Sequence, residues 1–118
     1  LNSFSSAHDC CKIAEWIEEA LNGEDIEAVV IGRHDRDRWG AVGTSAFNGA
    51  TINKVVSWDE AKPFLSYEFD SGYGSAGCHP VYVWTPTRIF FVGEYDGSTS
   101  LSWVPRHPIP CEPQFSGG

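Results

Sequence analysis

The chain has 118 residues, of which 42 % are hydrophobic and 14 % aromatic, which is enough apolar material for one hydrophobic core but too little chain for two. We therefore expect a single domain spanning residues 1–118, without a disordered linker. Sixteen acidic against eight basic residues give a net charge of −8, which argues against direct binding to nucleic-acid phosphates. No apolar run approaches the ~18 residues of a membrane span, so no membrane association is expected.

The first predicted element is one amphipathic helix over residues 7–22. Residues 6–9 resemble an N-terminal capping signal, and Asn22-Gly23 supplies a C-terminal stop. At about 100° per residue, one arc of this helix is apolar and the opposite arc is mostly acidic. The apolar arc, which should face the core, contains Cys10, Ile13, Ala14, Trp16, Ile17, Ala20 and Leu21.

After the helix the sequence changes to a strand pattern. Residues 26–32 are apolar on both sides and rich in β-branched side chains, which is typical of a central strand. Shorter strands are expected at residues 39–42 and 54–58. A half-buried strand is expected at residues 65–69, because apolar and polar residues alternate there.

The segments between these strands have turn and loop sequences. Residues 33–38 alternate in charge, which predicts a solvated turn with His34 facing solvent. Residues 44–53 and the glycine-rich residues 70–79 are predicted to be loops. Residues 57–60 resemble a capping box, but a proline follows closely, so we expect a single helical turn there.

The C-terminal third predicts three consecutive strands, at residues 81–84, 89–95 and 98–104. Asp96-Gly97 is a strong signal for a two-residue hairpin turn. The predicted fold is α+β, with the N-terminal helix packed on one face of an antiparallel β-sheet of about five or six strands that ends in a three-stranded meander. The predicted register places Val83 opposite Phe90, Trp84 opposite Ile89, Val92 opposite Leu101, and Phe90 opposite Trp103.

This register divides the side chains between two faces. One face, which should receive the helix, gathers Val81, Val83, Phe90, Val92, Leu101 and Trp103. The other face is also rich in aromatic side chains, among them Tyr82, Trp84 and Phe91. We expect the loop at 44–53 or the loop at 70–79 to cover it. If neither does, it is a partner surface or the interface of a homodimer.

Four cysteines allow two disulfides in three connectivities, but a chain with this core does not need them. We therefore expect reduced thiols, with Cys10 pointing toward the core and Cys11 toward water. Residues 1–6 lack the pattern of a signal peptide, so a cytoplasmic location is expected. The alternative is a secreted protein with two disulfides.

Gly72, Gly74 and Gly77 match the spacing of a dinucleotide-binding loop, but a strand rather than a helix follows them. We therefore predict no cofactor and interpret the segment as a flexible loop that carries Tyr73 as a recognition residue. Zinc-type ligands such as Cys78 and His79 lack a metal-binding spacing, so no metal ligands and no catalytic residues are assigned. A small enzyme or metal-binding protein that uses the loop at 70–79 remains the alternative function.

The acidic residues cluster near the N-terminal helix. They form either a solvated face or a surface for a protein partner with a basic surface. The leading hypothesis is a small acidic protein-binding module, with an inhibitor of a basic nucleic-acid-handling protein, of the kind phages use against host defence, as one form of it. The predicted partner-binding residues are Glu15, Glu18, Glu19, Glu24, Asp25, Glu27, Tyr73, Tyr82, Trp84 and Phe91.

Overall fold

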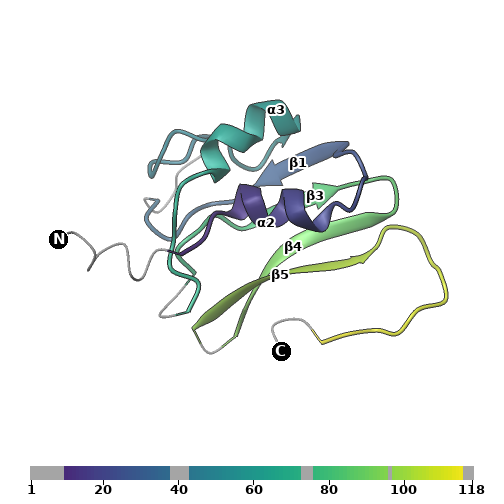
Figure 1. Ribbon diagram of the computed structural model, residues 1–118. Helices are drawn as coiled ribbons and strands as arrows, with labels where there is room; N and C mark the ends of the chain where they lie inside the picture. Colours follow the sequence, from purple (N-terminus) through teal and green to yellow (C-terminus); the bar gives the residue numbers. More distant parts are fainter. Residues whose placement is uncertain (1–9, 38–42, 73–75, 96, 116–118) are drawn as a thin grey trace.

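The computed structural model describes residues 10–37, 43–72, 76–95 and 97–115. Its centre is a five-stranded antiparallel sheet in the order β2-β1-β3-β4-β5, and helix α2 lies across one face of it (Figure 1). The α+β class predicted from the sequence is confirmed. The strands are β1 (Ala28–Ile31), β2 (Val55–Val56), β3 (Val81–Trp84), β4 (Arg88–Tyr95) and β5 (Ser98–Pro105).

Helix α2 (Ile13–Ala20) is shorter than the predicted helix at 7–22. Residues 10–12 are not helical, because Cys11 pairs with Phe69 in an isolated β-bridge and Lys12 is extended. The predicted capping signal at 6–9 lies outside the described residues. At the other end the stop is where the sequence predicts it, since Asn22 and Gly23 have φ angles of 51° and 91°.

The segment from β2 to residue 69 differs from the strand prediction. Ser57 ends β2 after two residues because its hydroxyl accepts a hydrogen bond from the backbone N–H of Glu60 (3.1 Å) and caps helix α3 (Trp58–Ala61). A 3₁₀ helix, η1 (Lys62–Leu65), follows directly. The predicted strand at 65–69 is therefore wrong, and of its residues only Phe69 takes part in β pairing. The predicted strand at 39–42 lies outside the described residues.

The registers of the two C-terminal hairpins are those that the sequence predicts, with Val83 opposite Phe90 and Phe90 opposite Trp103. The core lies between the sheet and α2. Ile13 and Ile17 are 1 % and 0 % exposed, and Phe90 is fully buried beneath them. Trp103 shares the face of Phe90 but is 50 % exposed, since it lies on the outer strand.

Among the described residues, no helix has the length and apolar character needed to cross a membrane.

Candidate functional site

The face of the sheet that points away from α2, here called the bare face, carries no charged side chain at any of its strand positions. Its strand positions follow from the observed pairing, because residues opposite one another in neighbouring strands share a face. In a chain with 20 % charged residues, strands normally place charged or polar side chains at the positions that face solvent. The bare face consists of Ala28, Val30, Val55, Tyr82, Trp84, Ile89, Phe91, Gly93, Tyr95, Ser98, Ser100, Ser102 and Val104.

The described parts of the loops at 44–53 and 70–79 leave much of the bare face exposed, and residues 111–115 border its β5 side across a cleft. Val55, Tyr82 and Tyr95 are 72 %, 56 % and 66 % exposed, and the Tyr82 and Trp84 rings contact one another edge to face with centroids 6.0 Å apart. The loops expected to cover these side chains instead contribute to the helix-side core, through Ile52 and Cys78 among others. The expectation of a loop cover is thus wrong for the described residues.

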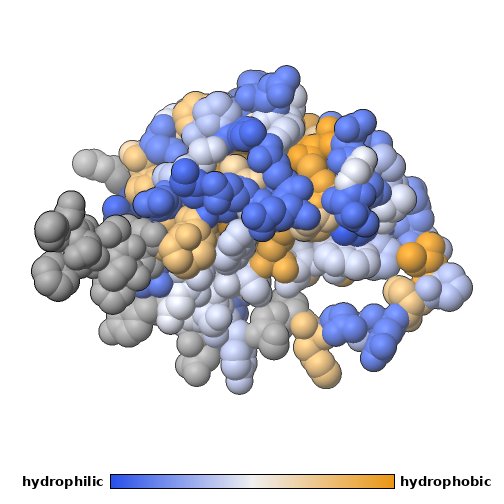
Figure 2. Space-filling model, viewed as in Figure 1, coloured by the Kyte–Doolittle hydropathy of each residue, from blue (hydrophilic) through white to orange (hydrophobic). Residues whose placement is uncertain are grey.

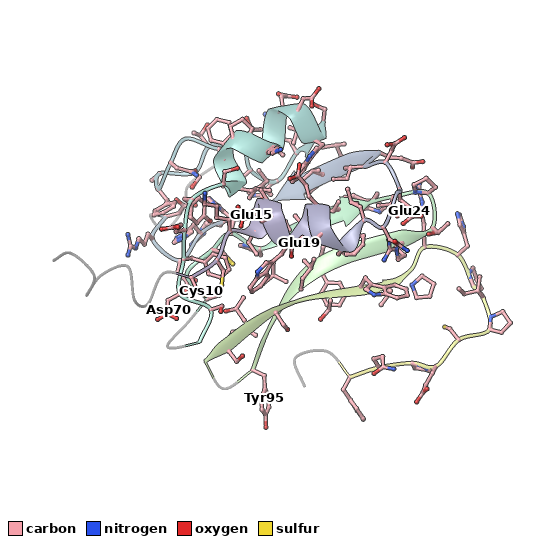
Figure 3. The ribbon with its side chains drawn as sticks, viewed as in Figure 1. Cys10, Glu15, Glu19, Glu24, Asp70 and Tyr95 are labelled. Carbon is pink, nitrogen blue, oxygen red and sulfur yellow. A yellow bond between two sulfur atoms is a disulfide. The ribbon has the colours of Figure 1, made fainter. Side chains whose placement is uncertain are left out.

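The opposite side of the molecule is strongly hydrophilic over α2 and α3 (Figure 2). Figure 3 shows Glu15 and Glu19 on α2, with Glu24 beyond the end of the helix. Glu15, Glu19 and Asp25 are exposed, and none of them forms an ion pair with a described residue. These three carboxylates are available to a partner.

The other three predicted acidic residues have internal partners. Glu18 forms an ion pair with Lys62 (2.7 Å), and Glu27 forms one with Arg106. Glu24 accepts hydrogen bonds from the hydroxyls of Thr85 and Thr87 and from Nε of Arg88 (2.9 Å).

These bonds, that of Thr87 foremost, hold the pKa of Glu24 below its usual value. Arg88 also donates to the carbonyl of Leu21 (2.7 Å), so Glu24 and Arg88 tie the end of α2 to the β3–β4 turn. Three of the six predicted acidic residues therefore have partners within the fold, and the role of all six in partner binding stays a prediction.

A buried polar cluster, which the sequence did not reveal, lies on the helix side of the sheet. Its members are Asp37, Ser45, Tyr67 and His79. The hydroxyl of Ser45 lies 2.8 Å from Oδ1 of Asp37 and 3.0 Å from Nε2 of His79, and the hydroxyl of Tyr67 lies 2.7 Å from Nδ1 of His79. His34 stacks on Phe47 beside the cluster, with ring centroids 4.0 Å apart.

One assignment of protons satisfies this cluster. Asp37 also accepts from the backbone N–H groups of His34 and Phe47, so the Ser45 hydroxyl donates to the carboxylate and accepts from Nε2–H of His79. Nδ1 of His79 then accepts from Tyr67, whose oxygen accepts from the backbone N–H of His79. The imidazole of His79 is therefore neutral.

The pKa shifts agree with this assignment. Burial first, and the neighbouring His34 second, lower the pKa of His79 to about 4. Burial acts to raise the pKa of Asp37, but the hydrogen bonds from Phe47, Ser45 and His34 outweigh it and hold that pKa below its usual value. Burial raises the pKa of the Tyr67 hydroxyl.

The polar cluster fixes the loops that carry it and does not resemble a working active site. Ser45 and His79 are 1 % and 0 % exposed, so no substrate atom reaches the Ser45 hydroxyl. This hydroxyl also already donates a hydrogen bond to Asp37. The prediction of a solvated turn at 33–38 is wrong for His34 and Asp37, which are 3 % and 8 % exposed.

The cysteines also differ from the prediction. Cys10 and Cys11 form a disulfide between adjacent residues, and the hydroxyl of Ser71 lies 3.2 Å from Sγ of Cys10. Cys10 is exposed and Cys11 is partly buried, the reverse of the expected orientation. The expectation of reduced thiols is wrong for this pair, whereas Cys78 and Cys111 are free. The cellular compartment stays a prediction.

The glycine-rich loop offers little support for the alternative function. Burial raises the pKa of the Cys78 thiol to about 12, so it is not a ready nucleophile. Tyr73 lies outside the described residues. Within the four described segments of the chain, no group of three or more His, Cys, Asp or Glu side chains is arranged to hold a metal ion.

Comparison of the chain with protein-family models, curated proteins and solved structures gives no match. The site must therefore be interpreted from its own geometry.

Proposed function

We propose that the chain is a protein-binding module and that the bare face is its contact surface. The observation that carries this proposal is the combination of exposed aromatic side chains with the absence of charge at every strand position of that face. Depletion of charge and enrichment in Tyr, Trp and Phe are typical of the central part of protein interfaces. Exposed apolar and aromatic side chains on an uncharged face are therefore interpreted as an interaction site.

The size of the bare face sets the expected strength of binding. Five strands about 4.8 Å apart occupy a width of about 24 Å when each is counted with its own width, and the eight residues of β4 and of β5 extend about 27 Å. Because the other strands are shorter, the face offers roughly 500 Å², or roughly 1,000 Å² counted over both partners. That total is near the lower limit for a specific interface, so we expect reversible binding rather than an obligate complex.

The exposed carboxylates add an electrostatic preference. Glu15, Glu19 and Asp25 lie outside the bare face, so they steer a partner by long-range attraction and do not contact it there. With a net charge of −8, the chain favours a partner with a basic surface, and inhibition of a basic nucleic-acid-handling protein fits this preference. A second copy of the chain would have to overcome the repulsion between two such charges.

Site-specific photo-crosslinking tests the proposal. A photoreactive residue is placed at Val55 or at Val104, two exposed positions of the bare face, and at Asp59 on α3 as a matched control on the helix side. We expect both bare-face probes to yield the same discrete protein adduct in extract of the native host, and the Asp59 probe to yield none.

A variant with a charge in the bare face tests whether this face makes the contact. Tyr82→Asp introduces a carboxylate at an exposed position, so it should abolish the adduct without unfolding the chain. An adduct of twice the chain mass identifies a second copy as the partner. The proposal is wrong if the bare-face probes give no discrete adduct, or if the adduct survives Tyr82→Asp in a folded chain.

A further inference from the structure

The outer edge of β5 presents unpaired backbone groups. Tyr95 pairs with Ser98 across a two-residue turn, so alternate residues of β5 direct their backbone toward β4 and the others direct it outward. The hydrogen bond from the N–H of Thr99 to the carbonyl of Ser71 (2.7 Å) agrees with this phase. The outward N–H groups of Leu101 and Trp103 have no acceptor in the part of the chain that the structure describes.

Two hollows meet at this edge. A groove of about 550 Å³ lies on its helix side, between α2 and β5, and is lined by Trp16, Glu19, Leu101 and Trp103 among others. A cleft of about 680 Å³ separates β5 from residues 111–115. Leu101 and Trp103 line both hollows, so the unpaired backbone groups have space beside them and apolar side chains above them.

The C-terminal segment does not fill this edge itself. Pro108, Pro110 and Pro113 lack the N–H group that a strand needs for regular pairing. At the other end of the sheet, β2 is only two residues long and offers little edge. The edge of β5 is thus the longer unpaired edge in the described structure.

We propose that the β5 edge binds an extended segment of a partner protein by strand addition. The segment pairs with the backbone of Leu101 and Trp103, and its alternate side chains enter the groove beside Trp16. Glu19 lines the groove and Glu15 lies one turn before it on α2, so a segment with apolar side chains flanked by a basic one is favoured. The groove of this site lies on the helix side of the sheet, whereas its cleft also borders Phe91, Ser102 and Val104 of the bare face. The strand-addition proposal does not depend on the bare-face proposal.

A second copy of the chain is a poorer occupant of this edge. Pairing of β5 with its symmetry-related copy places both α2 helices on the same side of the joined sheet. The carboxylates of Glu15 and Glu19 from the two copies would then lie on the same side of the joined sheet and repel one another. Among the described residues, no Lys or Arg forms an ion pair with either of them.

The test uses the purified chain and the synthetic peptide acetyl-Lys-Thr-Val-Thr-Val-Thr-Lys-amide. In a strand its two valines and two lysines share one side, which faces the groove. We expect titration of the ¹⁵N-labelled chain to shift the backbone amide signals of Leu101 and Trp103 and to slow their hydrogen exchange. The amide of Val55, on the far edge of the sheet, should not change.

Two modified peptides and two variants of the chain distinguish the contribution of backbone pairing from that of charge attraction. N-methylation of both valines removes the backbone donors and should abolish the shifts, and replacement of both lysines by glutamate should weaken binding about tenfold. Glu19→Lys should weaken binding of the original peptide about fivefold, whereas Asp59→Lys, on α3 outside the groove, should leave it unchanged.

The proposal is overturned if the N-methylated peptide binds as well as the original, or if the Leu101 and Trp103 amides do not respond. It is also overturned if those amides are protected without peptide in proportion to protein concentration, because the occupant is then a second copy. Bare-face crosslinking from Val55, on the far edge of the sheet, would be unaffected by any of these results, whereas Val104 lines the cleft beside β5.

Discussion

Acidification between about pH 7 and about pH 5 should destabilise the protein through His79. The pKa of this imidazole is lowered from 6.5 to about 4 in the fold, so the folded state binds fewer protons than the unfolded state in this range. Stability is therefore fully present above the unfolded pKa and is lost as the pH falls toward 4. A shift of this size corresponds to about 3 kcal/mol in total, of which about 2 kcal/mol is lost between pH 7 and pH 5.

The assay is urea unfolding at several pH values within this window, followed by tryptophan fluorescence. Three carboxyls also have a lowered pKa, namely Glu18, Glu24 and Asp37. Their protonation lowers the unfolding free energy only below about pH 4.5, so it does not affect stability in the upper part of the window. His79→Gln should flatten the pH dependence, whereas His107→Gln, at an exposed position, should leave it unchanged. An unfolding free energy that stays constant or increases from pH 7 to pH 5 would refute the assigned neutral imidazole.

Three further predictions concern the core and the thiols. Ser45→Ala removes the hydroxyl between Asp37 and His79 and should cost about 1–3 kcal/mol in urea unfolding, and a change below about 0.5 kcal/mol would argue against the polar cluster. Gly32→Ala places a Cβ 2.8 Å from Cγ of Pro80 and should lower the unfolding free energy by about 1–3 kcal/mol, which unchanged thermal unfolding would contradict. Iodoacetamide at about pH 8 should label only Cys111 in the folded, unreduced chain, as read by peptide mass spectrometry. Cys10 and Cys11 should be labelled after reduction, and the buried Cys78 only after unfolding. Labelling of Cys10 without reductant would contradict the disulfide.

The features that the sequence predicts well are those set by local patterns. The Asp96-Gly97 turn signal in the sequence and the alternation around it predict the register that pairs Phe90 with Trp103. The apolar spacing of α2 similarly places Ile13 and Ile17 in the core. In each case the residues that decide the structure lie within a few positions of one another.

The features that the sequence analysis missed depend on contacts between distant segments. Asp37, Ser45 and His79 come from three separate parts of the chain, and only the fold brings their side chains together. The charge alternation around Asp37 resembles a solvated turn because two of its donors, Ser45 and Phe47, lie 8 and 10 positions further along the chain. Likewise, no local pattern determines on which side of the sheet a loop packs, so the sequence left open whether a loop covers the bare face.

The internal ion pairs of three acidic residues also could not be predicted from the sequence. Lys62, Arg88 and Arg106 are 44, 64 and 79 positions from their partners Glu18, Glu24 and Glu27, so no helical spacing reveals these pairs. What remains for a partner is the uncharged face of the sheet and a few carboxylates on the opposite side.

Hydroxyl-radical footprinting tests the central claim most directly, because it measures whether the bare face is covered where the protein works. Tyr82 and Tyr95, which are exposed, should be modified readily in the dilute purified chain and protected in extract of the native host, while Trp58 on α3 is modified equally in both. Equal modification of Tyr82 in the two conditions would contradict the proposal that the bare face binds a protein.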